Sequence, residues 1–238
     1  MAKTGWIVWV CAAGISLLAM GNGQVAAQTV EFLPEADAHL TLNSMWRTYL
    51  QAKDDRDAGA TSQFSIGPSV QLYLKPLTRL KKVALFDLDE TKKRVLVLEV
   101  GYRYLTGPGI TSYNRMEPIL TFNVPIGAGF LLNDRNRADL DWKNSGFVWR
   151  YRNKLTIERT VAVGSYHLIP YAAVEPFYES QYQKWSTTAL YAGCLLPVGK
   201  HVQLNPYYEH QNNTGKAPNT QQNSVGLVMN LYFALPDR

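Results

Sequence analysis

Cysteine and histidine are scarce in this chain of 238 residues, which has two cysteines and four histidines. One cysteine, Cys11, lies in an apolar N-terminal stretch, so Cys194 is the only thiol in the rest of the sequence. A single thiol cannot form an internal disulfide or supply a zinc site of several thiolates. His201 and His210 have no further ligand residue at a metal-binding spacing. We therefore expect neither a disulfide framework nor a metal or cofactor.

Long apolar runs are also lacking beyond the N-terminus, where no segment reaches the roughly 18 apolar residues of a membrane helix. The N-terminus itself has Lys3, an apolar run of 16 residues at Gly5–Met20, and small residues up to Ala27. This order predicts a signal peptide at residues 1–27, cleaved after Ala27, and a mature domain at 28–238. An uncleaved anchor is the alternative, although the run is shorter than the roughly 20 residues that a spanning helix needs.

The excess of positive charge is small. The chain has 24 Lys and Arg against 19 Asp and Glu, and loss of Lys3 leaves 23 against 19, a net charge of +4. Because this charge is spread along the chain, we expect no nucleic-acid partner. Hydrophobic residues make up 46% of the chain and aromatic residues 12%. That composition is not typical of a disordered protein, and the length suits one large domain.

Apolar and polar residues alternate at period two, most clearly near the C-terminus. The apolar face there consists of Val225, Leu227, Met229, Leu231 and Phe233, and the other face of Ser224, Gly226, Val228, Asn230 and Tyr232. Such alternation is typical of a strand with unlike faces. It predicts ten strands, at 37–51, 62–75, 93–105, 112–124, 130–142, 147–160, 167–179, 185–196, 201–211 and 223–233. The register of 185–196 is unclear, because neither of its faces is cleanly apolar.

The lengths of these segments separate two all-β folds. Strands of a soluble β-sandwich are usually about 5–6 residues long, whereas a tilted membrane strand needs about 9–11. We therefore predict an antiparallel transmembrane β-barrel of about ten strands, within a range of 8–12. An even number would bring both chain ends to one side. The links 125–129, 162–165 and 197–200 should be short turns on that side, and the polar links 52–61 and 212–222 should be longer loops opposite. The link 76–92 is too long for this scheme and has no assigned role.

Charged residues occupy the faces that would line the barrel. The expected lumen charge network comprises Arg135, Arg137, Asp139, Arg150, Arg152, Glu158, Glu175 and Glu209. Opposite charges packed in a narrow lumen would pair by hydrogen bonds between arginine and carboxylate groups. One interpretation is a structural network that fills and stiffens the barrel. The other is a charged conduit or pocket for a small polar solute.

No catalytic constellation is evident in the sequence. Ser44, Ser165 and Ser186 are candidate nucleophiles, but no spaced motif distinguishes one of them. Asp87 and Asp89 resemble the acidic residues that outer-membrane proteases place near a histidine, yet the strand order puts them at the end opposite His210. We therefore expect no enzyme. An embedded hydrolase acting on lipid or lipopolysaccharide is one alternative function, and a soluble periplasmic ligand-binding sandwich is another.

Several segments resemble an uncharacterised family of bacterial outer-membrane barrels, the domain-of-unknown-function family 2490. These segments are Asn133–Arg137, Trp149–Leu155, Pro170–Tyr178, Tyr207–Gln211 and Gly226–Leu227. In the family, two arginine-rich strands are followed by an inward glutamate, and here Arg135, Arg137, Arg150, Arg152 and Glu175 hold those places. The resemblance implies a barrel but attaches no activity to it.

The C-terminal strand also resembles the signal that the barrel-assembly machinery reads. A polar residue, a glycine and alternating apolar residues occur at Ser224, Gly226, Met229, Leu231 and Phe233. The expectation from the sequence is thus an exported outer-membrane barrel, structural or narrow-pore, with a charged and largely filled lumen. Its partners would be outer-membrane lipid, the assembly machinery during biogenesis and possible small polar solutes.

Overall fold

The computed structural model describes residues 30–57, 60–74, 87–215 and 217–236. The expected signal peptide with its cleavage site, and most of the link 76–92, lie outside the described residues. In the described part, no helix is long and apolar enough to cross a membrane.

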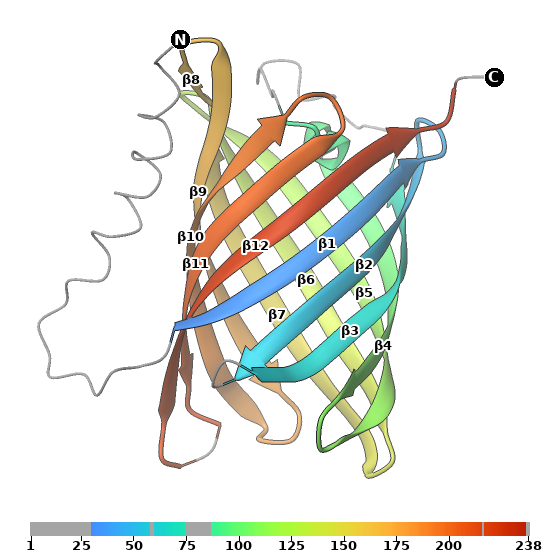
Figure 1. Cartoon of the computed structure of the whole chain (residues 1–238), viewed down its shortest axis with the longest axis vertical. Coiled ribbons are helices and arrows are strands. Elements are labelled where there is room, and N and C mark those ends of the chain that lie inside the picture. Colours follow the sequence, from blue (N-terminus) through green and yellow to red (C-terminus); the bar gives the residue numbers. More distant parts are fainter. Residues whose placement is uncertain (1–29, 58–59, 75–86, 216, 237–238) are drawn as a thin grey trace, which may run out of the picture.

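The fold is a closed β-barrel (Figure 1). The short strand β8 pairs only with β9, so eleven of the twelve described strands form the ring, which closes by the pairing of β9 with both β7 and β10. One turn of 3-10 helix, η2 (Glu90–Lys93), precedes β4. The strands are β1 (Val30–Thr41), β2 (Trp46–Asp57), β3 (Ala60–Tyr73), β4 (Leu96–Gly107), β5 (Ile110–Gly127), β6 (Phe130–Lys143), β7 (Gly146–Arg159), β8 (Val161–Val163), β9 (Tyr166–Glu179), β10 (Lys184–Val198), β11 (Val202–Asn213) and β12 (Thr220–Ala234).

The barrel is all-β, and its eleven ring strands lie within the expected range of 8–12, although the sequence pattern divided them into ten segments. The pairing is mixed rather than purely antiparallel. β1 and β12 pair in parallel, with Val30 opposite Asn223 and Thr41 opposite Ala234. In an up-and-down ring with an odd number of strands, the first and last strands run the same way, so the closing pair must be parallel. The described chain therefore starts and finishes at opposite ends of the barrel (Figure 1), rather than on one side.

The additional strand comes from the segment 37–51, which is two strands joined by a turn. The Oδ1 atom of Asn43 accepts hydrogen bonds from the backbone N–H groups of Met45 (2.8 Å) and Trp46 (3.0 Å). An asparagine side chain that caps the following backbone in this way favours a chain reversal. Alternation passes through the turn unbroken, since Leu42 and Trp46 are both exposed, so periodicity alone did not reveal it.

The expected contrast between short and long connections was also wrong. Most of 52–61 is strand: β2 continues to Asp57 and β3 begins at Ala60. Lys53 and Asp55 lie on the same face of β2 and form an ion pair of 2.7 Å. A run of charged residues can therefore be part of the strand. Connections are short at both ends of the barrel, except between β3 and β4.

A β-bulge explains the unclear register of 185–196. The pairing of β10 with β9 shifts by one residue between Trp185 and Thr187. The bulge turns two consecutive side chains inward, so Ser186 and Thr187 are both buried. Beyond the bulge the odd-numbered and even-numbered residues point to opposite sides from before, so a single period-two pattern does not describe the whole strand.

Many large apolar side chains are exposed on the outside of the barrel, and among the described residues buried polar and charged side chains outnumber buried apolar ones. Leu227, Met229 and Phe233 on β12 are exposed on the outer surface, whereas Ser224 is buried in the interior. The same alternation recurs around the ring. Exposed apolar side chains on other strands include Trp46, Leu50, Val70, Val100, Met116, Trp142, Trp149, Ile157, Val174 and Leu190.

Candidate functional site: the charged lumen

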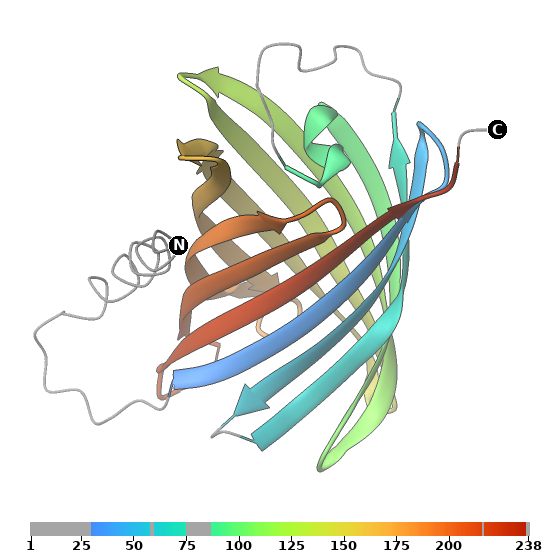
Figure 2. The same ribbon diagram turned by 45° about the horizontal axis from the view of Figure 1, so that its top comes forward.

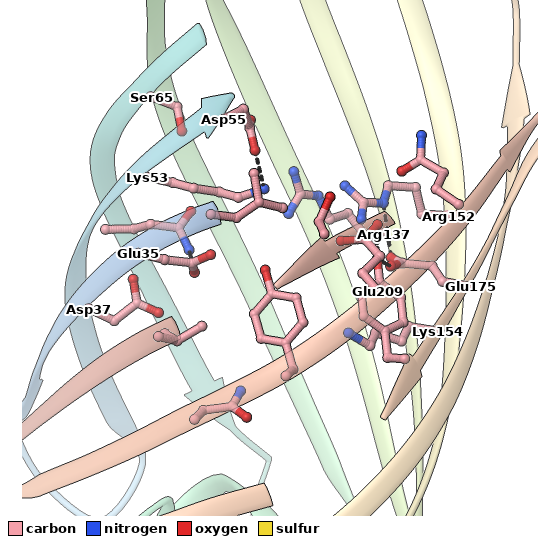
Figure 3. A pocket seen from close by; sticks show the side chains of 18 of the residues that line it. Glu35, Asp37, Lys53, Asp55, Ser65, Arg137, Arg152, Lys154, Glu175 and Glu209 are labelled. Atoms are coloured by element: carbon pink, nitrogen blue, oxygen red, sulfur yellow. Dashed lines mark hydrogen bonds and ion pairs between the residues drawn. The ribbon is translucent and has the colours of Figure 1, made fainter. Parts of the chain in front are cut away.

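A cavity of about 930 Å³ lies inside the barrel and is lined mainly by polar and charged side chains. Figure 3 shows residues from both sides of it. It extends from η2 to residues Ser62, Asn213 and Thr220 at the other end of the ring. The expectation of a charged lumen is consistent with this arrangement, but a substantial part of the interior is empty.

Asp139 on β6 is the centre of a buried arginine cluster. Its carboxylate pairs with Arg137 and lies 2.7 Å from Nη2 of Arg150, its cross-strand neighbour on β7. Nη1 of Arg115 is 3.8 Å away and Nη1 of Arg152 is 4.0 Å away. Because Asp139 is fully buried, these cations compensate a carboxylate that would be very costly to bury alone.

Glu175 on β9 forms the second centre. Its Oε1 accepts a hydrogen bond from Nε of Arg152 at 2.9 Å, and Nη2 of Arg135 lies 3.5 Å away. The hydroxyl of Tyr191 lies 2.9 Å from Glu175 Oε2 and 3.2 Å from Glu209 Oε1. Seven of the eight residues expected in the lumen network thus form two adjoining groups, linked through Arg152.

Glu158 does not belong to either group. Its carboxylate binds Nζ of Lys92 at 2.7 Å, and the same Nζ lies 2.6 Å from Oδ2 of Asp87. Lys92 comes from η2, in the segment to which the sequence assigned no role. No sequence pattern marks this contact, because a polar run between strands has the composition of an ordinary loop.

We call the segment Asp87–Lys93 the plug, because it lies inside one end of the ring of strands (Figure 2). It contacts four parts of the wall: Asp89 binds Arg47 of β2 at 2.8 Å, and Lys92 binds β7 as described. Asp87 accepts a hydrogen bond of 2.8 Å from Gln203 of β11, and Asn123 of β5 donates to the Thr91 carbonyl at 3.2 Å. Contacts on four strands place the plug across the lumen.

Electrostatics favour the charged forms of the plug residues. Burial disfavours the Asp89 carboxylate, but Arg47 and Lys92 outweigh it and hold the pKa of Asp89 below its usual range. Burial likewise disfavours the Lys92 ammonium, and Asp87 and Glu158 outweigh it, so the pKa of Lys92 is raised. The charges of Asp89 and Lys92 are therefore stabilised by the opposite charges beside them.

The sequence prediction missed Glu31 and Glu35 at the start of β1, because both lie before the predicted strand 37–51. Glu31, Glu35 and Asp37 alternate onto the inner face and line the cavity. The period-two pattern of β1 continues back to Val30, so the residues before 37 could have been recognised as strand.

The candidate nucleophiles and histidines are spread around the barrel. His210 accepts or donates a hydrogen bond with Asn223 at 2.8 Å on the later half of β11, whereas Asp87 binds Gln203 at the start of that strand. The expected separation of His210 from Asp87 is thus observed. Across the described ranges, no group of three or more His, Cys, Asp or Glu residues is placed to hold a metal ion.

The five residues of the expected assembly signal all lie on β12. Ser224 and Gly226 face the lumen, whereas Met229 and Phe233 are exposed outside. The strand is paired on both sides, with β11 and with β1.

Comparison with known proteins gives one match. The model of the family described as "Protein of unknown function (DUF2490)" matches residues 39–222. No curated protein and no solved structure matches the chain. The matched region spans most of the barrel, from β1 to the start of β12.

Proposed function

Since this chain belongs to the DUF2490 family of proteins of unknown function, we propose from its own geometry that it is a bacterial outer-membrane barrel. In this proposal residues 1–27 are a signal peptide cleaved after Ala27, and the barrel-assembly machinery inserts the mature chain. The lumen is a narrow compartment for polar solutes that the plug closes at one end. The single observation that carries this proposal is the inverted burial, with apolar side chains outside and charged ones inside.

The lengths of the strands support a membrane location. The ring strands have 12 to 18 residues, more than the about 9–11 that a tilted strand needs to cross a bilayer. The surplus leaves the strand ends, with charged residues such as Asp54 and Arg56, in the aqueous phase. A closed ring also leaves no unpaired strand edge, which is the condition for backbone in hydrocarbon.

Clustered aromatic residues on the outer surface also support this location. Trp149 stacks on Tyr178 with ring centroids 5.5 Å apart, and Tyr178 contacts Trp185 edge-on at 5.8 Å. Trp142 and Phe147 form a further pair at 5.5 Å beside the turn between β6 and β7. Aromatic girdles of this kind lie at the headgroup level of membrane barrels.

The test is to express the full chain in a Gram-negative host and to examine its outer-membrane fraction. We expect a mature protein that begins at residue 28, resists extraction by carbonate and shows heat-modifiable gel mobility. Recovery of the protein in the soluble periplasmic fraction would overturn the proposal. The fold is a closed barrel, not the β-sandwich that the soluble ligand-binding alternative assumed. An assay for hydrolysis of lipid or lipopolysaccharide by the same fraction tests the embedded-hydrolase alternative.

A further inference from the structure

Two basic residues on the lumen wall are incompletely neutralised. Arg135 of β6 and Lys154 of β7 are directly opposite each other in the sheet, where like charges repel. Lys154 lies over the ring of Tyr191, 3.6 Å from its centroid, and among the described residues no carboxylate lies within 4.0 Å of its Nζ. Nε of Arg135 has no hydrogen-bond partner in the described part, and its only ion pair there, with Glu175, is 3.5 Å long.

Two carboxylates on β1 likewise form no ion pair within 4.0 Å with a described residue. Asp37 is buried, and its Oδ1 has no hydrogen-bond partner in the described ranges. Glu35 accepts a hydrogen bond from Gln51 at 2.7 Å but forms no ion pair with a described residue. Lys53, which is opposite Glu35 in the sheet, instead directs its Nζ to Asp55. Both carboxylates line the cavity.

These acidic and basic residues face each other across the lumen. Figure 3 shows Glu35 and Asp37 on one side of the cavity, and Arg152 and Lys154 on the other. Eleven tilted strands spaced about 4.8 Å apart form a ring roughly 20 Å across, too wide for these side chains to meet. These acidic and basic side chains therefore lie on opposite walls of an open space of about 930 Å³.

From this arrangement we infer that the lumen binds a small zwitterionic solute, such as a short peptide with free termini. Its carboxylate binds Arg135 and Lys154, and its ammonium group binds Asp37 and Glu35. A tripeptide in extended form is about 10 Å long, which suits the space between side chains projecting from opposite walls. The inference rests on the proposed function, in which this compartment takes up polar solutes.

Opposite uncompensated charges distinguish this ligand class from others. A purely anionic solute would neutralise Arg135 and Lys154 but would be repelled by the carboxylates of β1. A purely cationic solute would pair with the carboxylates of β1 but would be repelled by Arg135 and Lys154. A charge-assisted hydrogen bond contributes more than a neutral one. A zwitterion that forms such bonds with both walls therefore binds more tightly than a purely anionic or a purely cationic solute.

The experiment compares three peptides of matched shape on barrels already shown to be inserted in lipid nanodiscs. Triglycine carries both charges, N-propionyl-glycylglycine lacks only the ammonium group, and triglycine amide lacks only the carboxylate. Isothermal titration calorimetry should give an affinity for triglycine about tenfold above that for either analogue. Equal affinity for triglycine and N-propionyl-glycylglycine would overturn the inference, as would no saturable binding. Because insertion is established first, either result leaves the proposed function standing.

Two variants connect each end of the peptide to its wall. In Asp37→Asn, the preference for triglycine over the propionyl analogue should shrink, because only Glu35 then remains for the ammonium group. The anionic analogue itself should bind no less tightly than before, because a carboxylate that repels it is gone. In Lys154→Gln, triglycine and the propionyl analogue should both bind more weakly, while the cationic triglycine amide should bind no less tightly than before. Lys200→Gln, in the exposed turn after β10, is the charge-matched control and should change none of the three. A uniform loss for all peptides would indicate a structural defect and would contradict the assigned contacts.

Discussion

The ring of Tyr207 on β11 lies directly over Gly226 on β12, its cross-strand partner. A Cβ atom at position 226 would come within 2.0 Å of the Tyr207 Cζ atom. Tyr171 covers Gly193 in the same way, with 2.6 Å between the ring and a Cβ. On the inner face a large aromatic thus fills the space that an opposite glycine leaves. The glycine of the expected assembly signal is therefore also a packing requirement of the finished barrel.

Gly226→Ala should destabilise the barrel by about 1–3 kcal/mol, the usual cost of overpacking, because the Tyr207 ring must move. Urea unfolding in detergent micelles, followed by gel mobility, measures the loss. The double variant Gly226→Ala with Tyr207→Ala should lose less stability than the sum of the losses in the two single variants, because the steric conflict is absent when Tyr207 is alanine. If the two losses simply add, the ring is not the cause.

Leu227→Arg should cost roughly 2–4 kcal/mol and impair assembly, because Leu227 is exposed on the outer face near the middle of β12. Heat-modifiable mobility after refolding into vesicles is the readout. Leu227→Met, which stays apolar, is the matched control and should fold normally. Normal folding of the arginine variant would mean that this face does not contact lipid.

Lys92→Met should release the plug. The substitution leaves the buried carboxylates of Asp87 and Glu158 without their cation, and breaking a buried pair typically costs about 3–5 kcal/mol. Conductance across a planar bilayer should therefore rise above that of the unaltered barrel. Lys93→Met is the control, because Lys93 is half-exposed and its pair with Glu90 is 3.8 Å long. Equal conductance of all three proteins would show that the plug does not close the lumen.

The ion pair between Asp89 of the plug and Arg47 of β2 should also resist acid. Because the pKa of Asp89 in the folded protein lies below its usual value of 3.8, its stabilising effect is complete above pH 3.8 and is lost only as the pH falls through the lower value. At pH 4 the unaltered barrel should therefore keep a lower conductance than the Arg47→Gln variant. Arg47→Gln removes the nearest cation, so the pKa of Asp89 should rise and the plug should open at a higher pH. An identical pH profile for both proteins would contradict the role of this pair.

The strand positions were the part of the fold that the sequence predicted well, because period-two alternation is a local property. Nine of the ten predicted segments match single strands to within a few residues. The division of 37–51 was missed since Asn43 reverses the chain without changing the parity of the pattern. The parallel closure of β1 on β12 was missed because it depends on the number of strands in the whole ring.

The charged lumen was predictable as a composition but not as a set of contacts. Alternation places Arg135 and Glu175 on the inner face, yet the cluster that each joins depends on the register of β6, β7 and β9. The plug could not be predicted for a different reason. Its residues have the composition of a loop, and only the closed ring brings Lys92 to Glu158.

A residue-by-residue scan of lipid contact along β12 tests the central claim most directly. Cys194, the only cysteine in 28–238, is first replaced by serine. Single cysteines at positions 224, 225 and 227 to 231 then carry a fluorophore in vesicles of brominated lipid; position 226 is left out because a side chain there would collide with Tyr207. The account predicts quenching at the odd positions, from Val225 to Leu231, and none at the even ones, which face the lumen. Quenching without this period of two, or at no position, would contradict a barrel whose apolar face contacts lipid.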